Sequence, residues 1–266
     1  MTFDIEGSFA TEGVACVRRL LDDAMLALAT EAIERALAAP TPLMLRASTE
    51  DDGAFVEDFV TWPTNEAMRE LVTHPRLGRL AAHLTDSRVV RLHHDHVLVK
   101  EAGTAQRTPW HQDQPYYNVD GRQNVSFWIP IDPVPRSASL EVVVGSQLGP
   151  WYLPRTFMDG AAKWFPEGSL AEFPDLNPSA GHVEVRGWSL EPGDAICFHM
   201  AAVHGAPGFE GPGRRRVVSV RYVGDDAVHA PRPWRTPPPF PGLEDDLAAG
   251  QPFEHPSFPV VWEDQV

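Results

Sequence analysis

The sequence predicts a mainly β protein, a β-sandwich or jelly roll with helices flanking its N-terminal side. From residue 89 onward, short segments alternate between apolar and polar residues and are bounded by Gly or Pro, as is typical of strands. Before that point, apolar residues recur instead at the spacing of an amphipathic helix. Several short strands with few helices among them favour a sandwich or jelly roll.

Two helical patterns precede the predicted strands. Apolar residues at helical spacing follow Asp22, which is placed to cap a helix, and Pro40 is placed to end it. A second pattern covers residues 65–84 and is interrupted at Pro75. Neither helix can bury its apolar stripe alone, so residues 1–87 are expected to be a helical flank of the core and not a separate domain.

The chain is expected to form a single domain over residues 1–266. The jelly-roll core is predicted over residues 88–225, with an inserted loop over 149–181 that carries no strand period. A Pro-rich tail over 226–266 should be extended over the surface or loose, and residues 43–63 show no clear period. Strands are predicted at 14–17, 88–100, 124–131, 140–144, 183–185, 195–199 and 214–223.

Composition narrows the class of protein and of partner. The 266 residues are 43% hydrophobic, enough for a substantial core, and their formal net charge of −15 repels phosphate backbones and anionic membranes. We therefore expect a small-molecule partner, no nucleic acid and no membrane. The two cysteines form no paired motif, and neither a signal peptide nor 18 consecutive apolar residues occur, which predicts a reducing, cytoplasmic location.

The segment T-P-W-H-Q-D-Q-P-Y-Y offers a metal-binding pair. His111 and Asp113 are two residues apart, so on an extended backbone both side chains leave the same face. The expected third ligand is His204, with His199 as the alternative. Two histidines and one carboxylate on one face of a metal leave positions open for a co-substrate and dioxygen, as in non-haem Fe(II) oxygenases.

A second cluster, His93-His94-Asp95-His96, is a rival metal site. On a strand its members separate, with His94, His96 and Lys100 on one face and His93 and Asp95 on the other. The simpler interpretation is a polar strand whose His94 and His96 line a cavity.

Three arginines open the last predicted strand, R-R-R-V-V-S-V-R-Y. Such a run is usually a solvated strand start, but alternation places Arg215, Ser219 and Arg221 together on one side. A buried arginine near a metal suits bidentate capture of a carboxylate.

The chain resembles the phytanoyl-CoA dioxygenase family of Fe(II)/2-oxoglutarate oxygenases. The resemblance covers about residues 10–225 and rests on motifs in family order: W-H-Q-D, N-V-S-F-W-I-P-I-D, S-L-E-V-V-V-G-S-Q, G-D-A-I-C-F-H and R-R-R-V-V-S. It implies a double-stranded β-helix (jelly roll) with flanking N-terminal helices. It also implies Fe(II) held by His111, Asp113 and His204, with 2-oxoglutarate and O2 as co-substrates.

The resemblance extends to the co-substrate site. Arg215 stands eleven residues after the distal histidine, where the family has the arginine that binds the far carboxylate of 2-oxoglutarate, and strand alternation selects the same residue. Trp128, at the F-W-I-P position, is implied to line the pocket. Gln112, Lys100 and Ser219 are also expected to face it.

Two departures from the family pattern lie outside the implied ligands. Ser137-Ala138 stands where the family has N-G, and Val144 to Gln147 stand where it has P-G-S-H. Because Asp113 is present, the halide-accepting variant, which has a small residue at that position, is not expected.

The predicted activity is Fe(II)- and 2-oxoglutarate-dependent oxidation, most simply hydroxylation, of a small-molecule metabolite with release of succinate and CO2. The family acts on acyl-CoA thioesters, amino acids and secondary metabolites, and no residue here selects among them. The alternative is a cupin-like metal-dependent isomerase or a metabolite-binding protein that does not use dioxygen. Arg215 and Trp128 argue against it, because an isomerase has no need of a dicarboxylate clamp.

Aromatic residues of the 149–181 insert and of the helical flank are predicted to form the substrate entrance. A reactive metal centre needs water kept out, and a closing loop is the usual device. We expect an aromatic side chain of the insert to pack over the metal, opposed by one from the flank, with two histidines lining the cavity. The candidates are Trp151, Tyr152, Trp164, Phe165, Phe59, Trp62, His94 and His96. The alternative is an ordered surface loop whose aromatic residues only fill the core.

Overall fold

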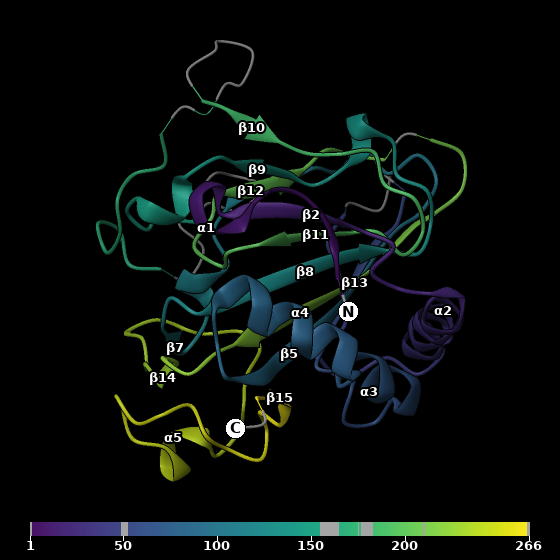
Figure 1. Cartoon of the computed structure of the whole chain (residues 1–266). Coiled ribbons are helices and arrows are strands. Elements are labelled where there is room, and N and C mark those ends of the chain that lie inside the picture. The colour runs from purple at the N-terminus through teal and green to yellow at the C-terminus, as the bar shows by residue number, and fades with distance from the viewer. Residues whose placement is uncertain are drawn as a thin grey trace.

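A large antiparallel sheet forms the centre of the computed structural model, which describes residues 2–48, 53–154, 165–174, 176, 183–209 and 211–264 (Figure 1). The order of its strands is β1-β2-β11-β8-β13-β5-β4-β3, and β15 pairs with β5 off this path. The strands are β1 (Asp4–Ser8), β2 (Val14–Arg18), β3 (Leu45–Arg46), β4 (Phe55–Phe59), β5 (Val89–Lys100), β8 (Asn124–Pro130), β11 (Ala195–Phe198), β13 (Arg215–Val223) and β15 (Val260–Glu263).

A smaller antiparallel sheet, in the order β10-β9-β12-β6, packs against one face of the large one. Its strands are β6 (Thr108–His111), β9 (Glu141–Val143), β10 (Val185–Arg186) and β12 (His204–Ala206), and β7 (Val119–Asp120) pairs separately with β14 (Val228–His229). Two facing antiparallel sheets form a jelly roll. The predicted mainly β jelly-roll fold with N-terminal helices is confirmed.

The central strands are buried on both faces, which explains their nearly continuous apolar runs. Trp128 and Val217 belong to the core between the two sheets, whereas their neighbours Phe127 and Val218 belong to the core beneath the helices. Alternation along a strand sends successive side chains to opposite faces, so each central strand contributes to both cores. Figure 1 shows the smaller sheet on one side of the large sheet and α2, α3 and α4 on the other.

The helices begin where the sequence offers caps. In α2 (Asp23–Ala38), the Asp22 carboxylate accepts from the amide of Met25 at 2.9 Å, which satisfies one donor of the first turn. The predicted interruption at Pro75 is present and separates two shorter helices, α3 (Glu66–Val72) and α4 (Pro75–Thr85). The remaining ones are α1 (Phe9–Glu12) and α5 (Leu243–Asp246). No helix of the described residues is long and apolar enough to cross a membrane.

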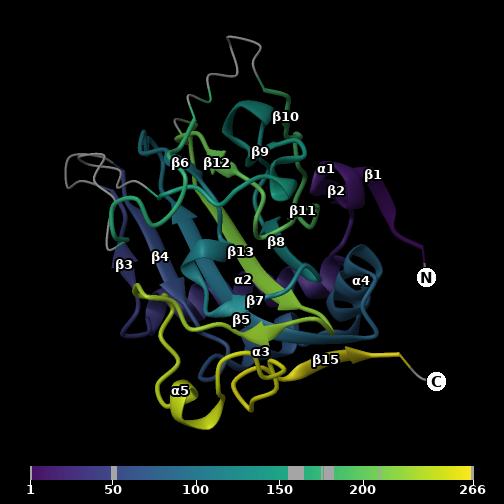
Figure 2. The ribbon, with the colours of Figure 1, turned by 90° about the vertical axis from the view of Figure 1, so that its left-hand side faces the viewer.

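One prediction about the fold is wrong, and one of the two alternatives given for the tail is excluded. The segment 43–63 is not without regular structure, because β4 pairs along β5 within the large sheet. The tail is also not loose: β15 pairs with β5, and Phe253 and Phe258 are buried at 1% and 0% exposure. In both views the tail, with α5 and β15, lies beneath β5 (Figures 1 and 2). Residues 155–164, 175 and 177–181 of the 149–181 insert lie outside the described residues.

The register of the large sheet aligns side chains in rows that run across neighbouring strands. Within one row, residues of β4, β5, β13 and β8 lie directly opposite one another, so their side chains project from the same face. The rows that matter below are Phe55–Lys100–Arg215, Glu57–Leu98–Val217–Pro130, Phe59–His96–Ser219–Trp128 and His94–Arg221–Ser126.

Candidate metal centre

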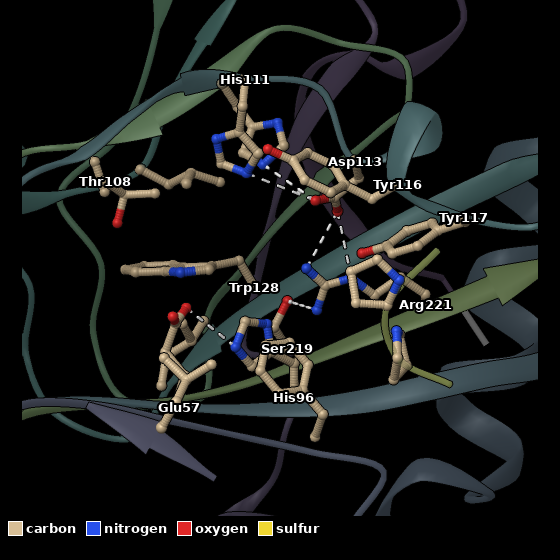
Figure 3. A pocket seen from close by; sticks show the side chains of 18 of the residues that line it. Glu57, His96, Thr108, His111, Asp113, Tyr116, Tyr117, Trp128, Ser219 and Arg221 are labelled. Carbon is tan, nitrogen blue, oxygen red and sulfur yellow. Dashed lines mark hydrogen bonds and ion pairs between the residues drawn. The ribbon is translucent and has the colours of Figure 1, made fainter. Parts of the chain in front are cut away.

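The smaller sheet, the large sheet and the tail enclose a cavity of about 330 Å³. Side chains of β4, β5, β6, β8, β12 and β13 line it, together with Arg235 and three consecutive prolines of the tail. Figure 3 shows His111 and Asp113 at one side of this cavity and Glu57 and His96 at the other.

Two histidines face one another across the smaller sheet. His204 of β12 lies directly opposite His111 of β6, and their ring centroids are 4.2 Å apart. The sequence permits this close pairing at Gly205, because a Cβ there would lie only 3.0 Å from the carbonyl oxygen of Thr108. The glycine therefore allows β12 and β6 to pair closely, and this pairing brings together two histidines that are 93 positions apart in the sequence.

Asp113 lies two residues past the end of β6, and its two carboxylate oxygens have different surroundings. Oδ2 accepts hydrogen bonds from Ser126 Oγ at 3.0 Å and from Arg221 Nη2 at 3.1 Å. Oδ1 lies 3.7 Å from Nε2 of both His111 and His204. The protein thus holds one oxygen and directs the other toward the two imidazoles.

The hydrogen bonds of the two rings make them suitable metal ligands. Nδ1 of His111 lies 2.8 Å from the carbonyl of Pro109, and Nδ1 of His204 lies 3.0 Å from that of Ala202. A carbonyl only accepts, so each Nδ1 carries the proton and each Nε2 carries the lone pair. With the Asp113 carboxylate, the ligand atoms lie within 4.8 Å of one another. This donor set fits a divalent transition metal such as Fe(II).

The charges and burial of the site favour an ionised Asp113 and a neutral His204. Burial alone would raise the pKa of Asp113, but Arg221 and the two histidines outweigh it and lower that pKa below its usual range. Burial is also the main reason that the pKa of His204 is lowered. Asp113 is therefore ionised and His204 neutral at pH 7, as metal binding requires.

Arg215 lies at the other end of β13 and faces the same cavity. It is 4% exposed, its guanidinium carbon lies 5.5 Å from the centre of the Trp128 ring, and Nη1 donates to the carbonyl of Ala138. Its Nε has no partner, and no carboxylate of the described residues forms an ion pair with it. Burial without a compensating anion lowers the pKa of Arg215 to about 10. Trp128 and Ser219 also line the cavity, as expected.

Two residues expected in the co-substrate pocket point elsewhere. Lys100 donates through Nζ to the carbonyls of Gln106 at 2.6 Å and Pro207 at 3.1 Å, and it is not among the residues that line the cavity. Gln112 projects opposite to its two neighbours: its amide donates to Ala201 O at 2.7 Å, and its carbonyl accepts from Tyr152 N at 2.8 Å. It therefore ties two loops together behind the metal centre.

The rival histidine cluster does not assemble a metal site. A β-bulge between Arg221 and Tyr222 leaves His93 as an extra residue of β5, so His93 and His94 both contact the ring of Tyr117. The predicted alternation is therefore wrong at His93. Asp95 instead accepts from the backbone and side chain of Thr61.

The substrate candidates separate into those that line the cavity and those that do not. Phe59 and His96 line it. Trp62 packs against the core beneath the helices, His94 lies behind Tyr117, and Trp151 lies under the guanidinium of Arg232, so none of these three lines the cavity.

The predicted closing aromatics are also placed differently. Tyr152 packs against Phe173, away from the cavity. Phe165 is buried between Tyr116 and Trp234, so it supports the wall residue Tyr116 from behind and does not cover the metal ligands. Trp164 lies outside the described residues.

Sequence reasoning missed three groups that the structure brings to the site. Arg221 pairs with Asp113, Glu57 lines the cavity beside His96, and the prolines 237–239 close one side. Alternation from Arg215 already placed Arg221 on the correct face, but nothing in the sequence identified its partner. The pattern of β4 and of the tail gave no comparable signal.

Comparisons with known proteins agree with the fold. The chain is similar to the non-haem α-ketoglutarate-dependent epimerase SnoN from nogalamycin biosynthesis, with 22% identity, a TM-score of 0.75 and coverage of 97% of this chain and 94% of that one. It is also similar to the carbocyclase SnoK from the same biosynthesis, with 21% identity, a TM-score of 0.73 and coverage of 95% of this chain and 93% of that one. A third similar structure is EctD from S. alaskensis, solved with 2-oxoglutarate and 5-hydroxyectoine. The identity is 19%, the TM-score is 0.65, and the match covers 92% of this chain and 83% of that one.

At these identities the likeness to solved structures shows a shared fold. No curated protein matches the chain. The model of the phytanoyl-CoA dioxygenase family (PhyH), however, matches residues 9–217, which is most of the chain and includes β6, β12 and the start of β13. The chain belongs to the phytanoyl-CoA dioxygenase family.

Proposed function

We propose that this protein is an Fe(II)- and 2-oxoglutarate-dependent enzyme that oxidises a small-molecule metabolite. The observation that carries the proposal is one cavity with two complementary ends. One end gathers His111, Asp113 and His204 with their lone pairs converging. The other holds Arg215, a buried cation without an anionic partner among the described residues. A dicarboxylate that chelates a metal with one end needs such a cation for the other.

The chain's own residues would divide the work as follows. His111, Asp113 and His204 hold the metal, and Arg221 keeps Asp113 oriented and ionised. Arg215 binds the far carboxylate of 2-oxoglutarate beside Trp128. Bound Fe(II) would supply the activation of dioxygen, coupled to conversion of 2-oxoglutarate into succinate and CO2.

The outcome for the substrate begins with removal of a hydrogen atom. In hydroxylation, one oxygen atom of O2 enters succinate and the other converts a C–H bond of the substrate into C–OH. Hydroxylation is the simplest outcome that we propose. Two proteins of the same fold, SnoN and SnoK, are an epimerase and a carbocyclase, and both reactions can begin with the same hydrogen removal.

The cavity and the cysteines support the remaining parts of the proposal. A volume of about 330 Å³ suits a small molecule and not a polymer. Cys16 and Cys197 are both buried and unbridged, which fits a reducing, cytoplasmic setting.

Succinate release tests the proposed function. Protein loaded anaerobically with Fe(II) is mixed with 2-oxoglutarate, O2 and a panel of metabolites, and succinate and oxidised products are measured by mass spectrometry. We expect substrate-stimulated succinate formation that disappears in Asp113→Ala. Turnover of a metabolite that needs neither 2-oxoglutarate nor O2 would instead support the metal-dependent isomerase.

A further inference from the structure

Glu57 lies in the cavity but away from both the metal ligands and Arg215. In β4 the alternate residues Phe55, Glu57 and Phe59 line the cavity. β4 is separated from β13 by β5, so Glu57 lies two strands, about 10 Å, from the strand that carries Arg215. The cavity therefore continues past the proposed co-substrate site toward β4, and Glu57 belongs to this extension.

The side chain next to Glu57 is held rigidly. His96 lies directly across from Phe59, and their rings stack with centroids 3.9 Å apart and planes 20° apart. Nε2 of His96 lies 3.3 Å from Glu57 Oε1, without the alignment of a hydrogen bond. Nδ1 of His96 is buried and has no hydrogen-bond partner. His96 thus lies packed beside Glu57, whose partly exposed carboxylate is the polar group that faces the cavity (Figure 3).

The charge of Glu57 is not balanced by a fixed cation. Its side chain is 17% exposed, and no arginine or lysine of the described residues forms an ion pair with it. The other carboxylate that lines the cavity, Asp113, is already bound by Arg221. A partly buried, uncompensated carboxylate favours a cationic ligand that forms charge-assisted hydrogen bonds.

The surface around Glu57 is otherwise mostly apolar. Phe59, Leu98 and Leu45 lie on the same side, and the prolines 237–239 close the cavity from the tail. A ligand there would bury an apolar body and present one polar group to Glu57. Specificity in such pockets comes from a few polar groups of this kind.

We propose that Glu57, supported by His96, binds a protonated amino group of the substrate. The inference rests on the proposed function, because it assigns the metal and Arg215 to iron and 2-oxoglutarate and leaves Glu57 to the substrate. The substrate class is then a metabolite with a basic nitrogen on a largely apolar body. Glu57 is a substrate-binding residue that sets specificity, and His96 fixes its position.

Three probes with one phenyl body test the charge preference directly: 2-phenylethylamine, 2-phenylethanol and phenylacetate. Binding is followed by NMR titration of protein loaded with Zn(II), which cannot turn over, first with 2-oxoglutarate and then with each probe. We expect the amine to bind at least about tenfold more tightly than the alcohol, as a charge-assisted hydrogen bond does. Phenylacetate should bind no better than the alcohol.

The matched variants are Glu57→Gln, which removes the charge and keeps the shape, and Glu31→Gln, which changes an exposed carboxylate of α2. Glu57→Gln should lose the amine preference and keep wild-type affinity for 2-oxoglutarate, which also shows that it is folded. Glu31→Gln should keep the preference.

Equal binding of the amine and the alcohol to the wild type, or an amine preference that persists in Glu57→Gln, would overturn the inference. So would tighter binding of phenylacetate, since it would assign the extension to Arg235. Failure of 2-oxoglutarate to bind in the first titration contradicts the proposed function instead, so the two failures are distinguishable.

Discussion

The two ends of β13 each carry a buried arginine, and their surroundings are opposite. Arg221 is 5% exposed and pairs with Asp113 at 3.1 Å. Arg215, six residues earlier on the same face, is 4% exposed and pairs with no carboxylate of the described residues. Burial disfavours both cations, yet Asp113 raises the pKa of Arg221 while the pKa of Arg215 falls to about 10.

The contrast indicates which arginine is structural and which is poised for a ligand. A buried ion pair is costly to break, because removing one partner leaves the other uncompensated. A buried cation without an anionic partner already bears that desolvation cost before a ligand binds, and an anionic ligand can relieve it. We therefore infer that Arg221 completes the metal end and that Arg215 receives the co-substrate.

Removing a metal ligand should give the largest effect. Each of the variants His111→Ala, Asp113→Ala and His204→Ala keeps two of the three ligands. Loss of a residue that only hydrogen-bonds to a metal ligand typically lowers metal affinity by about 10–100-fold. We therefore expect loss of a ligand itself to lower the affinity for Fe(II) by at least about 100-fold. Anaerobic Fe(II) titration measures it.

His199→Gln is the control for this loss. The His199 ring bonds the backbone of Arg122 at 3.0 Å and of Ala201 at 3.0 Å, so the variant should keep wild-type iron affinity. Wild-type iron binding by His111→Ala would show that the metal lies elsewhere.

Replacing each arginine of β13 by methionine sharpens the comparison through stability. Without metal, Arg221→Met should lower the free energy of unfolding by about 3–5 kcal/mol, because Asp113 is left buried and unpaired. Arg215→Met should change it by less than about 1 kcal/mol, since no ion pair is broken. Urea unfolding measures both.

Zn(II) supplies a further check on the same pair of variants. A bound divalent cation replaces the charge that Asp113 loses, so Zn(II) should restore most of the stability of Arg221→Met. Equal destabilisation by the two substitutions would remove the distinction between the two ends.

A smaller, pH-dependent effect should come from the histidines behind the metal end. Burial lowers the pKa of His93 to about 3, so the folded protein resists protonation that the unfolded chain accepts below about pH 6.5. This ring therefore costs the folded protein no stability above about pH 6.5, and the free energy of unfolding falls as the pH drops below that value. Between pH 7.5 and 5.5 the loss is about 1.4 kcal/mol for one such ring.

The variant His93→Phe isolates this contribution, because the other buried histidines remain. Its ring can keep the aromatic contacts with Tyr117 and Phe258. Urea unfolding at the two pH values should show a fall in stability about 1.4 kcal/mol smaller than in the wild type. An unchanged pH dependence would mean that His93 titrates normally in the folded protein.

The metal end could be predicted from the sequence because its pattern is local. His111 and Asp113 are two residues apart at a strand end. At the other end of the cavity, the family spacing of eleven residues from His204 and the alternation along β13 together selected Arg215. The partner of Arg221 could not be predicted, because Asp113 is 108 residues away and only the fold brings them together.

The errors have equally local causes. Lys100 lies in the same row as Arg215, but its ammonium turns toward two loop carbonyls that no strand pattern reveals. β4 was missed because its cavity face mixes Phe55 and Phe59 with Glu57, which disguises its alternation. His93 was assigned to the wrong face because a bulge adds one residue, and bulges leave little trace in a sequence.

The central claim, that Arg215 binds the far carboxylate of 2-oxoglutarate at a metal held by Asp113, is tested most directly by one anaerobic titration. 2-Oxoglutarate is added to Fe(II)-loaded protein, and the visible charge-transfer absorption of the chelate is followed. We predict saturation in the wild type and in Arg214→Gln, a midpoint at least about tenfold higher in Arg215→Gln, and no band in Asp113→Ala. An unchanged midpoint in Arg215→Gln, or a larger shift in Arg214→Gln, would contradict the claim.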